Sequence, residues 1–110
     1  MEMEMEIGAG ELKERPDRGD EIDLVDVREP FEWGMANLEG YGARLIPMGE
    51  VVERMEEMDP AREIVFICRS GSRSMQVTRY LRAQGYARAR NLRGGVLAWS
   101  EEVDPSFPRY

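Results

Sequence analysis

The sequence predicts a single α/β domain over residues 1–110, with a mainly parallel sheet of about five strands sandwiched between helices. Short β-branched runs bounded by turn residues alternate with segments of helical periodicity along the chain. This order is typical of parallel strands joined by crossover helices. A chain of 110 residues is also long enough to bury one core without disulfides or structural metals. We therefore expect one core and no second domain.

Five segments are expected to form strands. The clearest are residues 22–27 and 64–67, "IDLVDV" and "IVFI", whose β-branched character is typical of strands buried on both faces. Residues 43–48 and 87–92 are weaker candidates. Residues 1–7 alternate methionine or isoleucine with glutamate, which indicates a strand with one buried and one solvated face. The glutamates favour an edge position, because they discourage pairing with other chains.

Helices are expected between these strands, at residues 11–15, 30–35, 50–58, 72–84 and 95–99. Pro16 is expected to end the first of them. The segment 72–84 is the best formed, because small and apolar side chains recur in it at helical spacing and Gly85 follows as a C-terminal cap. The recurring residues are Ser74, Val77, Thr78 and Leu81.

The composition excludes several classes of function. A formal net charge of -7 argues against general nucleic-acid binding. No apolar run approaches the roughly 18 residues needed to span a bilayer. The N-terminus is acidic where a signal peptide is basic and then apolar, so we expect a cytoplasmic protein. With one cysteine and no histidine, we expect no internal disulfide, no metal site and no cofactor, and a histidine base is excluded.

The charges are unevenly distributed along the chain. Residues 64–100 contain seven arginines and no acidic residue. We interpret the four from Arg79 to Arg90 as a solvated basic face paired with acidic neighbours. Arg69 and Arg73 are different, because they flank the only cysteine.

Cys68 is the strongest candidate for a functional residue. It directly follows the expected strand 64–67, and ligands of parallel α/β sheets bind beyond the carboxyl ends of the strands. Small residues after it allow the backbone to curl around the sulfur with N–H groups pointing inward, and the next helix and two arginines add positive potential. These features predict a reactive thiolate at neutral pH. The alternative is an inert cysteine that packs as a small hydrophobic residue. The loop consists of Arg69, Ser70, Gly71, Ser72 and Arg73.

Three motifs, in this order and spacing, resemble those of the rhodanese-like domain, a sulfurtransferase family. They are "LVDVREPFEW" at 24–33, "IVFICRSGSRS" at 64–74 and "LRGGVLAW" at 92–99. The resemblance covers almost the whole chain and implies a three-layer sandwich with its active-site loop at Cys68. The final "VDPSFPRY" is similar to the tail of rhodanese domains fused to, or working beside, adenylating enzymes of molybdopterin and thiolation pathways. Asn37 departs from the family, which usually carries histidine there at a structural position.

The resemblance implies that Cys68 accepts a sulfane sulfur from a donor such as thiosulfate and holds it as a persulfide. Inward N–H groups of residues 69–73 would stabilise the terminal sulfur, and Arg69, with Arg73 as a second candidate, would orient the anionic donor. A structural ion pair of Arg73 with Asp26 or Glu29 is an equal alternative. Supporting roles are expected for Asp26, Arg28 and Ser74. Packing roles are expected for Trp33, Tyr86 and Trp99, and a tight turn for Gly94 and Gly95.

Two other functions remain open at this point. One is a catalytically silent binding module with the same fold, and the other is a cysteine phosphatase or arsenate reductase. Cysteine phosphatases use Cys-x5-Arg, whereas Arg73 is five residues after Cys68 and gives the shorter Cys-x4-Arg, which fits one extra sulfur atom better than a phosphate. The expected partners are a small anionic sulfur donor and a protein sulfur donor or sulfur-carrier acceptor. We expect no nucleic acid, no membrane, and a monomer or weak homodimer.

Overall fold

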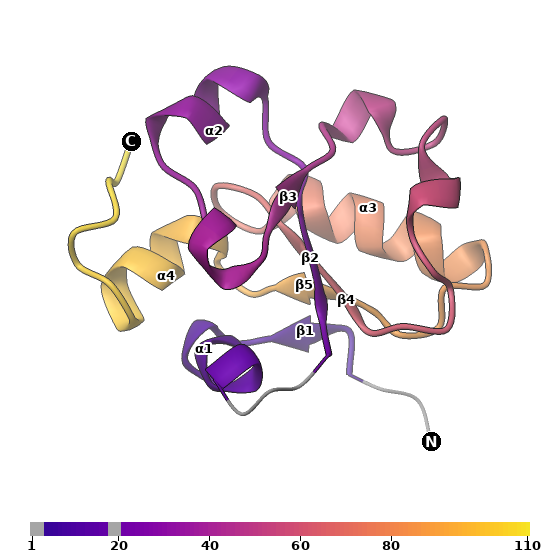
Figure 1. The fold of residues 1–110 in the computed structure, drawn as a ribbon, viewed down its shortest axis with the longest axis horizontal. Coiled ribbons are helices and arrows are strands. Elements are labelled where there is room, and N and C mark those ends of the chain that lie inside the picture. The colour runs from indigo at the N-terminus through magenta and orange to yellow at the C-terminus, as the bar shows by residue number, and fades with distance from the viewer. Residues whose placement is uncertain (1–3, 18–20) are drawn as a thin grey trace.

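The computed structural model describes residues 4–17 and 21–110 and contains a five-stranded parallel sheet with the order β1-β5-β4-β2-β3 (Figure 1). The strands are β1 Glu6–Ile7, β2 Asp23–Asp26, β3 Arg44–Leu45, β4 Ile64–Ile67 and β5 Ala89–Leu92. Each lies inside a segment expected to be a strand, and β1 is an edge strand as predicted. The predicted alternation over residues 1–3 lies outside the described residues. The α/β fold class is therefore confirmed.

Helices cover both faces of the sheet. One face packs against α1 and α4, and the other packs against α3 and the segment that contains η2 and η3 (Figure 1). The helices are α1 Ala9–Asp17, α2 Pro30–Met35, α3 Ser72–Ala83 and α4 Gly95–Glu102, and the short 3-10 helices are η1 Glu39–Tyr41, η2 Met48–Glu50 and η3 Met55–Glu57. Helix, sheet and helix form the three-layer sandwich that the sequence predicts.

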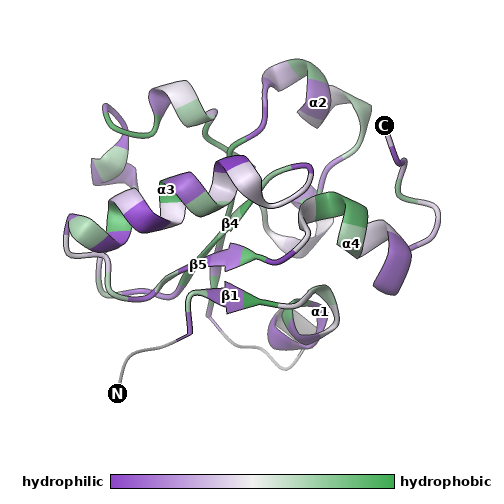
Figure 2. Cartoon of the chain, turned by 180° about the vertical axis from the view of Figure 1, so that it is seen from behind, coloured by the Kyte–Doolittle hydropathy of each residue, from purple (hydrophilic) through white to green (hydrophobic). Residues whose placement is uncertain are grey.

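The central strand β4 shows how the sheet divides two hydrophobic cores. Val65 and Ile67 belong to the core on the α1 and α4 side, whereas Ile64 and Phe66 belong to the core on the α3 side. Successive side chains of a strand point to opposite faces, so a strand buried on both sides must be apolar throughout. Figure 2 shows β4 as hydrophobic, whereas α3 alternates between polar and apolar residues. Cys68 continues the alternation and lies on the α3 side.

Two helices extend beyond their expected ends. α1 begins at Ala9 and runs past Pro16 to Asp17, because buried Ala9 and Leu12 anchor it to the core and a proline in the last turn removes only one intrahelical hydrogen bond. α4 continues from Trp99 to Glu102. α3 begins as predicted at Ser72 and ends at Ala83. Its end is a Schellman motif, in which Gly85 has a φ of 98° and the Tyr86 N–H donates to the Leu81 carbonyl at 3.0 Å.

The single helix expected over residues 50–58 is wrong. This segment consists of η2, turns and η3. The β-branched pair Val51 and Val52 has weak helix propensity. In addition, the Tyr86 hydroxyl donates to the Met55 carbonyl at 3.0 Å, and Arg44 donates to the Glu57 carbonyl at 3.0 Å. Met55 and Glu57 lie in the last turn of the expected helix, where carbonyl groups have no intrahelical partner, so these tertiary hydrogen bonds fix the η3 turn in place.

In the described part of the chain, none of the helices combines the length and the apolar character that a membrane span requires.

Candidate active site

Cys68 lies at the carboxyl end of β4, and three hydrogen-bond donors surround its sulfur. The Gly71 N–H donates to Sγ at 3.1 Å, the Ser74 N–H at 3.4 Å and the Ser74 hydroxyl at 3.2 Å. The thiol side chain is buried, with only 1% of the residue exposed. Ser74, for which we expected a supporting role, therefore contacts the sulfur twice. The inward N–H groups that reach Sγ belong to Gly71 and Ser74, while Ser70 and Ser72 are exposed.

The loop keeps this shape because two glycines allow close backbone approaches. Gly71 has a φ of 98°, which turns the chain from the loop into α3. Gly95 has a φ of 61°, and a side chain there would collide with the carbonyl groups of Cys68 and Arg69. This approach lets the Val96 N–H donate to the Cys68 carbonyl at 2.9 Å. The predicted tight turn at Gly94 and Gly95 therefore also holds the peptide groups of the cysteine loop.

Asn91 is a site residue that sequence reasoning missed. The Ser74 hydroxyl also hydrogen-bonds to the Asn91 side-chain oxygen, and Asn91 Nδ2 donates to Glu6 Oε2 at 3.0 Å. A serine has one hydroxyl proton, so Ser74 can donate it either to Sγ or to Asn91. No clear signal was present in the sequence, because Asn91 follows the equally polar Arg90 and only the structure shows that all of β5 is buried.

Arg73 forms an ion pair, but its partner is neither Asp26 nor Glu29. Its Nη1 and Nη2 donate to the two carboxylate oxygens of Glu32 at 2.7 and 2.9 Å. Glu32 is only 4% exposed. The hydrogen bonds from Arg73, helped by Tyr110 and the Glu29 N–H and opposed by burial, lower the pKa of Glu32 to about 2. The correct partner lies one helical turn beyond Glu29, on the inner side of α2, where the helix phase directs it toward the loop.

Asp26 and Arg28 form a second ion pair beside the first, and it is completely buried. Arg28 Nη2 lies 2.8 Å from Asp26 Oδ2, and the two side chains are 0% and 1% exposed. Arg28 also donates to the Ala36 carbonyl at 2.7 Å and to the Tyr110 hydroxyl at 3.0 Å. The pair joins the end of β2 to α2 and to the C-terminal tail, residues 103–110. The structure places both residues, for which we expect supporting roles, in this ion pair.

Tyr110 is a further residue of the site that the sequence did not single out. Its hydroxyl donates to Glu32 Oε2 at 2.6 Å, and its main-chain oxygen accepts hydrogen bonds from Nε and Nη2 of Arg69. Its ring centroid is 5.2 Å from Cζ of Arg69 and 5.8 Å from Cζ of Arg28. Burial, with the hydrogen bond to Glu32, raises the pKa of Tyr110. The tail and the cysteine loop are therefore connected through both a hydroxyl group and a main-chain oxygen.

Two of the four arginines from Arg79 to Arg90 are less solvated than expected, whereas Arg79 and Arg88 are exposed. Arg90 is 5% exposed and donates to Glu63 Oε2 at 3.1 Å. Arg82 donates to the Ala89 carbonyl at 2.7 Å, and Arg88 to the Ala61 carbonyl at 3.1 Å. The acidic neighbour expected for this group exists, but it is the buried Glu63. Three of these four arginines therefore join elements of the fold.

Local contacts explain the packing residues and the departure at position 37. Asn37 Nδ2 donates to the Trp33 carbonyl at 3.1 Å, and Asn37 Oδ1 accepts the Glu39 N–H at 3.0 Å. The asparagine therefore holds the turn after α2, in keeping with a structural position. Trp99 is buried and meets Tyr41 edge-on, with ring centroids 5.0 Å apart.

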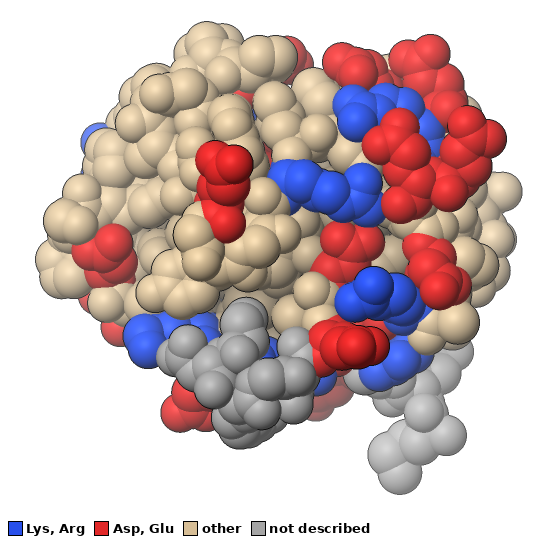
Figure 3. All heavy atoms as spheres, viewed as in Figure 1, with Lys and Arg blue, Asp and Glu red and all other residues tan. Residues whose placement is uncertain are grey.

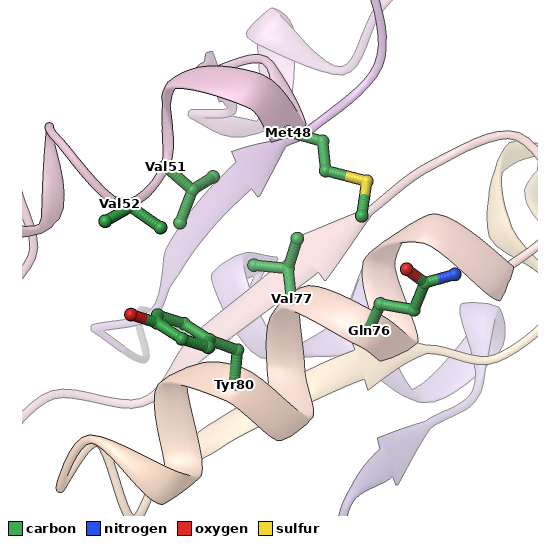
Figure 4. Close-up of a pocket in the computed structure, with 6 residues that line it drawn as sticks. All are labelled: Met48, Val51, Val52, Gln76, Val77 and Tyr80. Carbon is green, nitrogen blue, oxygen red and sulfur yellow. The ribbon is translucent and has the colours of Figure 1, made fainter.

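A groove of about 290 Å³ lies beside the site, between α3 and the segment around η2 (Figure 4). Its lining is mostly apolar, and none of its lining residues belongs to the cysteine loop. They are Met48, Val51, Val52, Gln76, Val77 and Tyr80.

Comparisons with known proteins identify the family to which this fold belongs. The family model of the rhodanese-like domain matches residues 8–102, so the chain belongs to the rhodanese-like domain family. A sulfurtransferase of Allochromatium vinosum is 40% identical over 100 residues, which cover 91% of this chain and 92% of that protein. YtwF of Bacillus subtilis, whose name assigns it provisionally to the sulfurtransferases, is 43% identical over 100 residues, with 91% and 94% covered.

The same relationship is visible in three dimensions. The crystal structure of a rhodanese-like domain protein from Staphylococcus aureus superimposes with a TM-score of 0.81 at 31% identity, covering 91% of this chain and 95% of that one. Sulfur transfer is therefore the general activity that the family and its named members support for this fold.

Proposed function

We propose that this protein is a sulfurtransferase in which Cys68 carries a sulfane sulfur as a persulfide. The observation that supports the proposal most directly is the set of donors around Sγ. Two main-chain N–H groups and one hydroxyl converge on a buried sulfur, at 3.1, 3.4 and 3.2 Å. Donors held in place in a water-poor site favour an anionic sulfur over a neutral one. A cysteine kept only for packing has no use for them.

The first half-reaction is a nucleophilic displacement. The Cys68 thiolate supplies the electron pair for a new S–S bond to the outer sulfur of thiosulfate. The S–S bond inside thiosulfate breaks, and its electron pair leaves with sulfite. The negative charge of the thiolate then resides on the terminal sulfur of the persulfide. No proton moves in this step, which is consistent with a chain that lacks histidine.

The second half-reaction returns the enzyme to its first state. An acceptor thiolate, or cyanide, attacks the terminal sulfur, and the Cys68–sulfur bond breaks. The electron pair of that bond returns to Sγ of Cys68. The thiolate formed in this way accepts hydrogen bonds from the same three donors. The acceptor remains a thiophilic small molecule or a protein thiol, and a sulfur-carrier protein is one candidate of this class.

Arg69 is the stronger candidate for binding the donor. Both terminal nitrogens of Arg73 are engaged by Glu32, so this guanidinium has little capacity left for a ligand. Arg69 directly follows Cys68 in the sequence and is partly exposed. An arginine binds the sulfonate-like oxygens of thiosulfate with charge-assisted hydrogen bonds.

The test is the mass of the protein after incubation with thiosulfate. The wild type gains the mass of one sulfur atom, the gain disappears with a thiol reductant, and Cys68→Ser shows no gain. Cys68 is the only cysteine, so the modification site is unambiguous. Hydrolysis of aryl phosphates or turnover of arsenate without persulfide formation would instead favour a phosphatase or reductase. An unmodified protein with every sulfane donor tried, protein persulfides included, would favour a silent binding module.

A further inference from the structure

Arg69, which we assign to donor binding, is already hydrogen-bonded to the C-terminal tail of the same chain. Nε and Nη2 of Arg69 both donate to the main-chain oxygen of Tyr110, and the tyrosine ring lies against the guanidinium, with 5.2 Å between Cζ and the ring centroid. Arg69 and Tyr110 are 41 residues apart in the sequence. Nε and Nη2 form one of the two edges through which a guanidinium binds an anion with paired hydrogen bonds, so a donor that binds this edge of Arg69 needs the same N–H groups.

The tail reaches this position through its own anchors. Phe107 is buried in the core that contains Trp99, and the Ser100 hydroxyl donates to the Phe107 carbonyl at 2.7 Å. Figure 1 shows the tail running from the end of α4 to α2. At α2, the Tyr110 hydroxyl donates to Glu32 at 2.6 Å and accepts from Arg28 at 3.0 Å. Phe107 is fully part of the core, whereas Tyr110 is only partly buried against it, so displacement of residues 108–110 leaves the Phe107 anchor in place.

Tyr110 is also connected to the second arginine of the loop. Glu32 receives the Tyr110 hydroxyl on Oε2, the same carboxylate oxygen that Arg73 Nη2 contacts at 2.9 Å. When the tail leaves, Arg69 becomes free, but Glu32 still holds Arg73 through two hydrogen bonds. Departure of the tail is therefore expected to uncover Arg69 and to leave Arg73 in place.

We propose that Tyr110 is a gate on the donor site, so that an anionic donor binds the Nε and Nη2 edge of Arg69 only by displacing the tail. The proposal rests on the proposed function in one respect, the assignment of Arg69 to donor binding. An anion competes for the guanidinium through charge, whereas a neutral molecule gains nothing by displacing Tyr110. Tyr110 therefore makes access to the site depend on the charge of the donor.

The test compares two alkylating reagents that differ in charge. The rates at which iodoacetate and iodoacetamide modify Cys68 are measured at one pH and one low salt concentration, and their ratio is taken for each variant. The ratio cancels any change in general access to the sulfur. Tyr110→Ala removes the hydroxyl and the ring that hold the main-chain oxygen of residue 110 against Arg69. The ratio then rises about fivefold, the effect of uncovering one partly exposed cation. Tyr110→Phe, which keeps the ring but loses both hydroxyl hydrogen bonds, gives a smaller rise.

Arg109→Ala is the matched control. Arg109 belongs to the same tail, but its side chain is 58% exposed and lies 3.9 Å from the exposed Glu101. The ratio stays at the wild-type value in this variant. In an Arg69→Gln background, Tyr110→Ala leaves the ratio unchanged, because no guanidinium remains to be uncovered.

Several results would overturn the gate. An unchanged or lower ratio in Tyr110→Ala would mean that Tyr110 does not shield Arg69 or instead positions it. A rise that persists in the Arg69→Gln background would mean that the tail acts elsewhere. The alkylation experiment requires no sulfur transfer, so the gate can fail while persulfide formation is observed, and the converse also holds. If Tyr110→Ala is unstable, as judged by circular dichroism, the Tyr110→Phe ratio decides alone.

Discussion

A buried carboxylate that is paired with arginine lies near each end of β4. One of the two pairs stabilises the fold, and the other lies beside the candidate active site. At the amino end, Glu63 directly precedes β4 and is contacted by Arg15 of α1 and by Arg90 of β5 at 3.1 Å. At the carboxyl end, beyond which Cys68 lies, Glu32 is contacted by Arg73 and Tyr110. Burial raises the pKa of Glu63, but the hydrogen bonds from Arg15 and Arg90 outweigh it and the net shift is downward.

The partners of the two carboxylates differ in kind. The Arg15 and Arg90 side chains are 17% and 6% exposed and extend from regular elements of the core. The Arg73 side chain is 34% exposed and lies at the junction of the loop and α3, and Tyr110 lies at the end of a tail. The amino-end cluster therefore fixes the sheet against α1, while the carboxyl-end cluster holds parts that a ligand can reach. Substitutions at the two sites should separate stability from chemistry.

Glu63→Gln is expected to have the largest effect on stability. It leaves buried Arg90 without a full charge partner, which costs about 3 to 5 kcal/mol of unfolding free energy. Urea unfolding followed by circular dichroism at neutral pH measures the loss. Per folded molecule, the rate of persulfide formation stays at the wild-type value.

The same substitution at an exposed ion pair is the control for this prediction. Glu57 pairs with Arg54 at 2.8 Å and its side chain is 41% exposed. It belongs to the mixed acidic and basic patch around η2 and η3 on the face in Figure 3. Glu57→Gln should cost far less than Glu63→Gln, because solvent screens an exposed ion pair. Equal losses in Glu63→Gln and Glu57→Gln would contradict a structural role for the buried cluster.

Glu32→Gln is expected to have a smaller effect that depends on pH. The folded pKa of Glu32 is about 2, below its ordinary value of 4.5. Its stabilisation is therefore fully present above pH 4.5 and is lost as pH falls toward about 2. The difference in unfolding free energy between wild type and variant should reach about 3 kcal/mol near neutral pH.

Urea titrations at several pH values measure this difference, which should shrink as the solution is acidified. Because Glu63 is present in both proteins, its own titration cancels in the comparison. A difference that is constant across the acid range would mean that the charge of Glu32 contributes nothing to its role.

Ser74→Ala is expected to have the smallest effect on stability and a clear effect on chemistry. Losing one buried hydroxyl hydrogen bond costs about 1 kcal/mol. Losing a donor at 3.2 Å from Sγ should slow persulfide formation about tenfold or more. Rapid-mixing mass spectrometry of the thiosulfate reaction measures the rate.

Thr78→Val is the matched variant on the same helix. The Thr78 hydroxyl is also buried, and it donates to the Ser74 carbonyl at 2.8 Å and not to the sulfur. The cost in stability should be similar, but the persulfide rate should stay at the wild-type value. If both variants slow the reaction equally, the Ser74 hydroxyl acts through the helix and not on Cys68.

Prediction from sequence succeeded where the signal is local. β4 and the start of α3 occupy the predicted residues, and the Cys68 loop lies between them, because a continuous apolar run, small residues and a helical pattern follow one another directly. It failed over residues 50–58, where apolar residues recur at helical spacing but the β-branched pair Val51 and Val52 has weak helix propensity and the segment forms η2, turns and η3. It also placed the wrong acid beside Arg73, because Asp26, Glu29 and Glu32 all lie in one motif and only the phase of α2 distinguishes them.

The amino-acid sequence by itself determined the layered α/β architecture, the place of Cys68 directly after β4 and the loop that follows it. These depend on periodicity and on residues adjacent in the chain. Only the tertiary structure decided which carboxylate holds Arg73, that Asn91 shares the Ser74 proton with the sulfur, and that Tyr110 lies on Arg69. Such contacts join residues separated by 17 to 41 positions. Which residues meet in these contacts depends on how the whole chain packs, and a local sequence pattern does not contain that information.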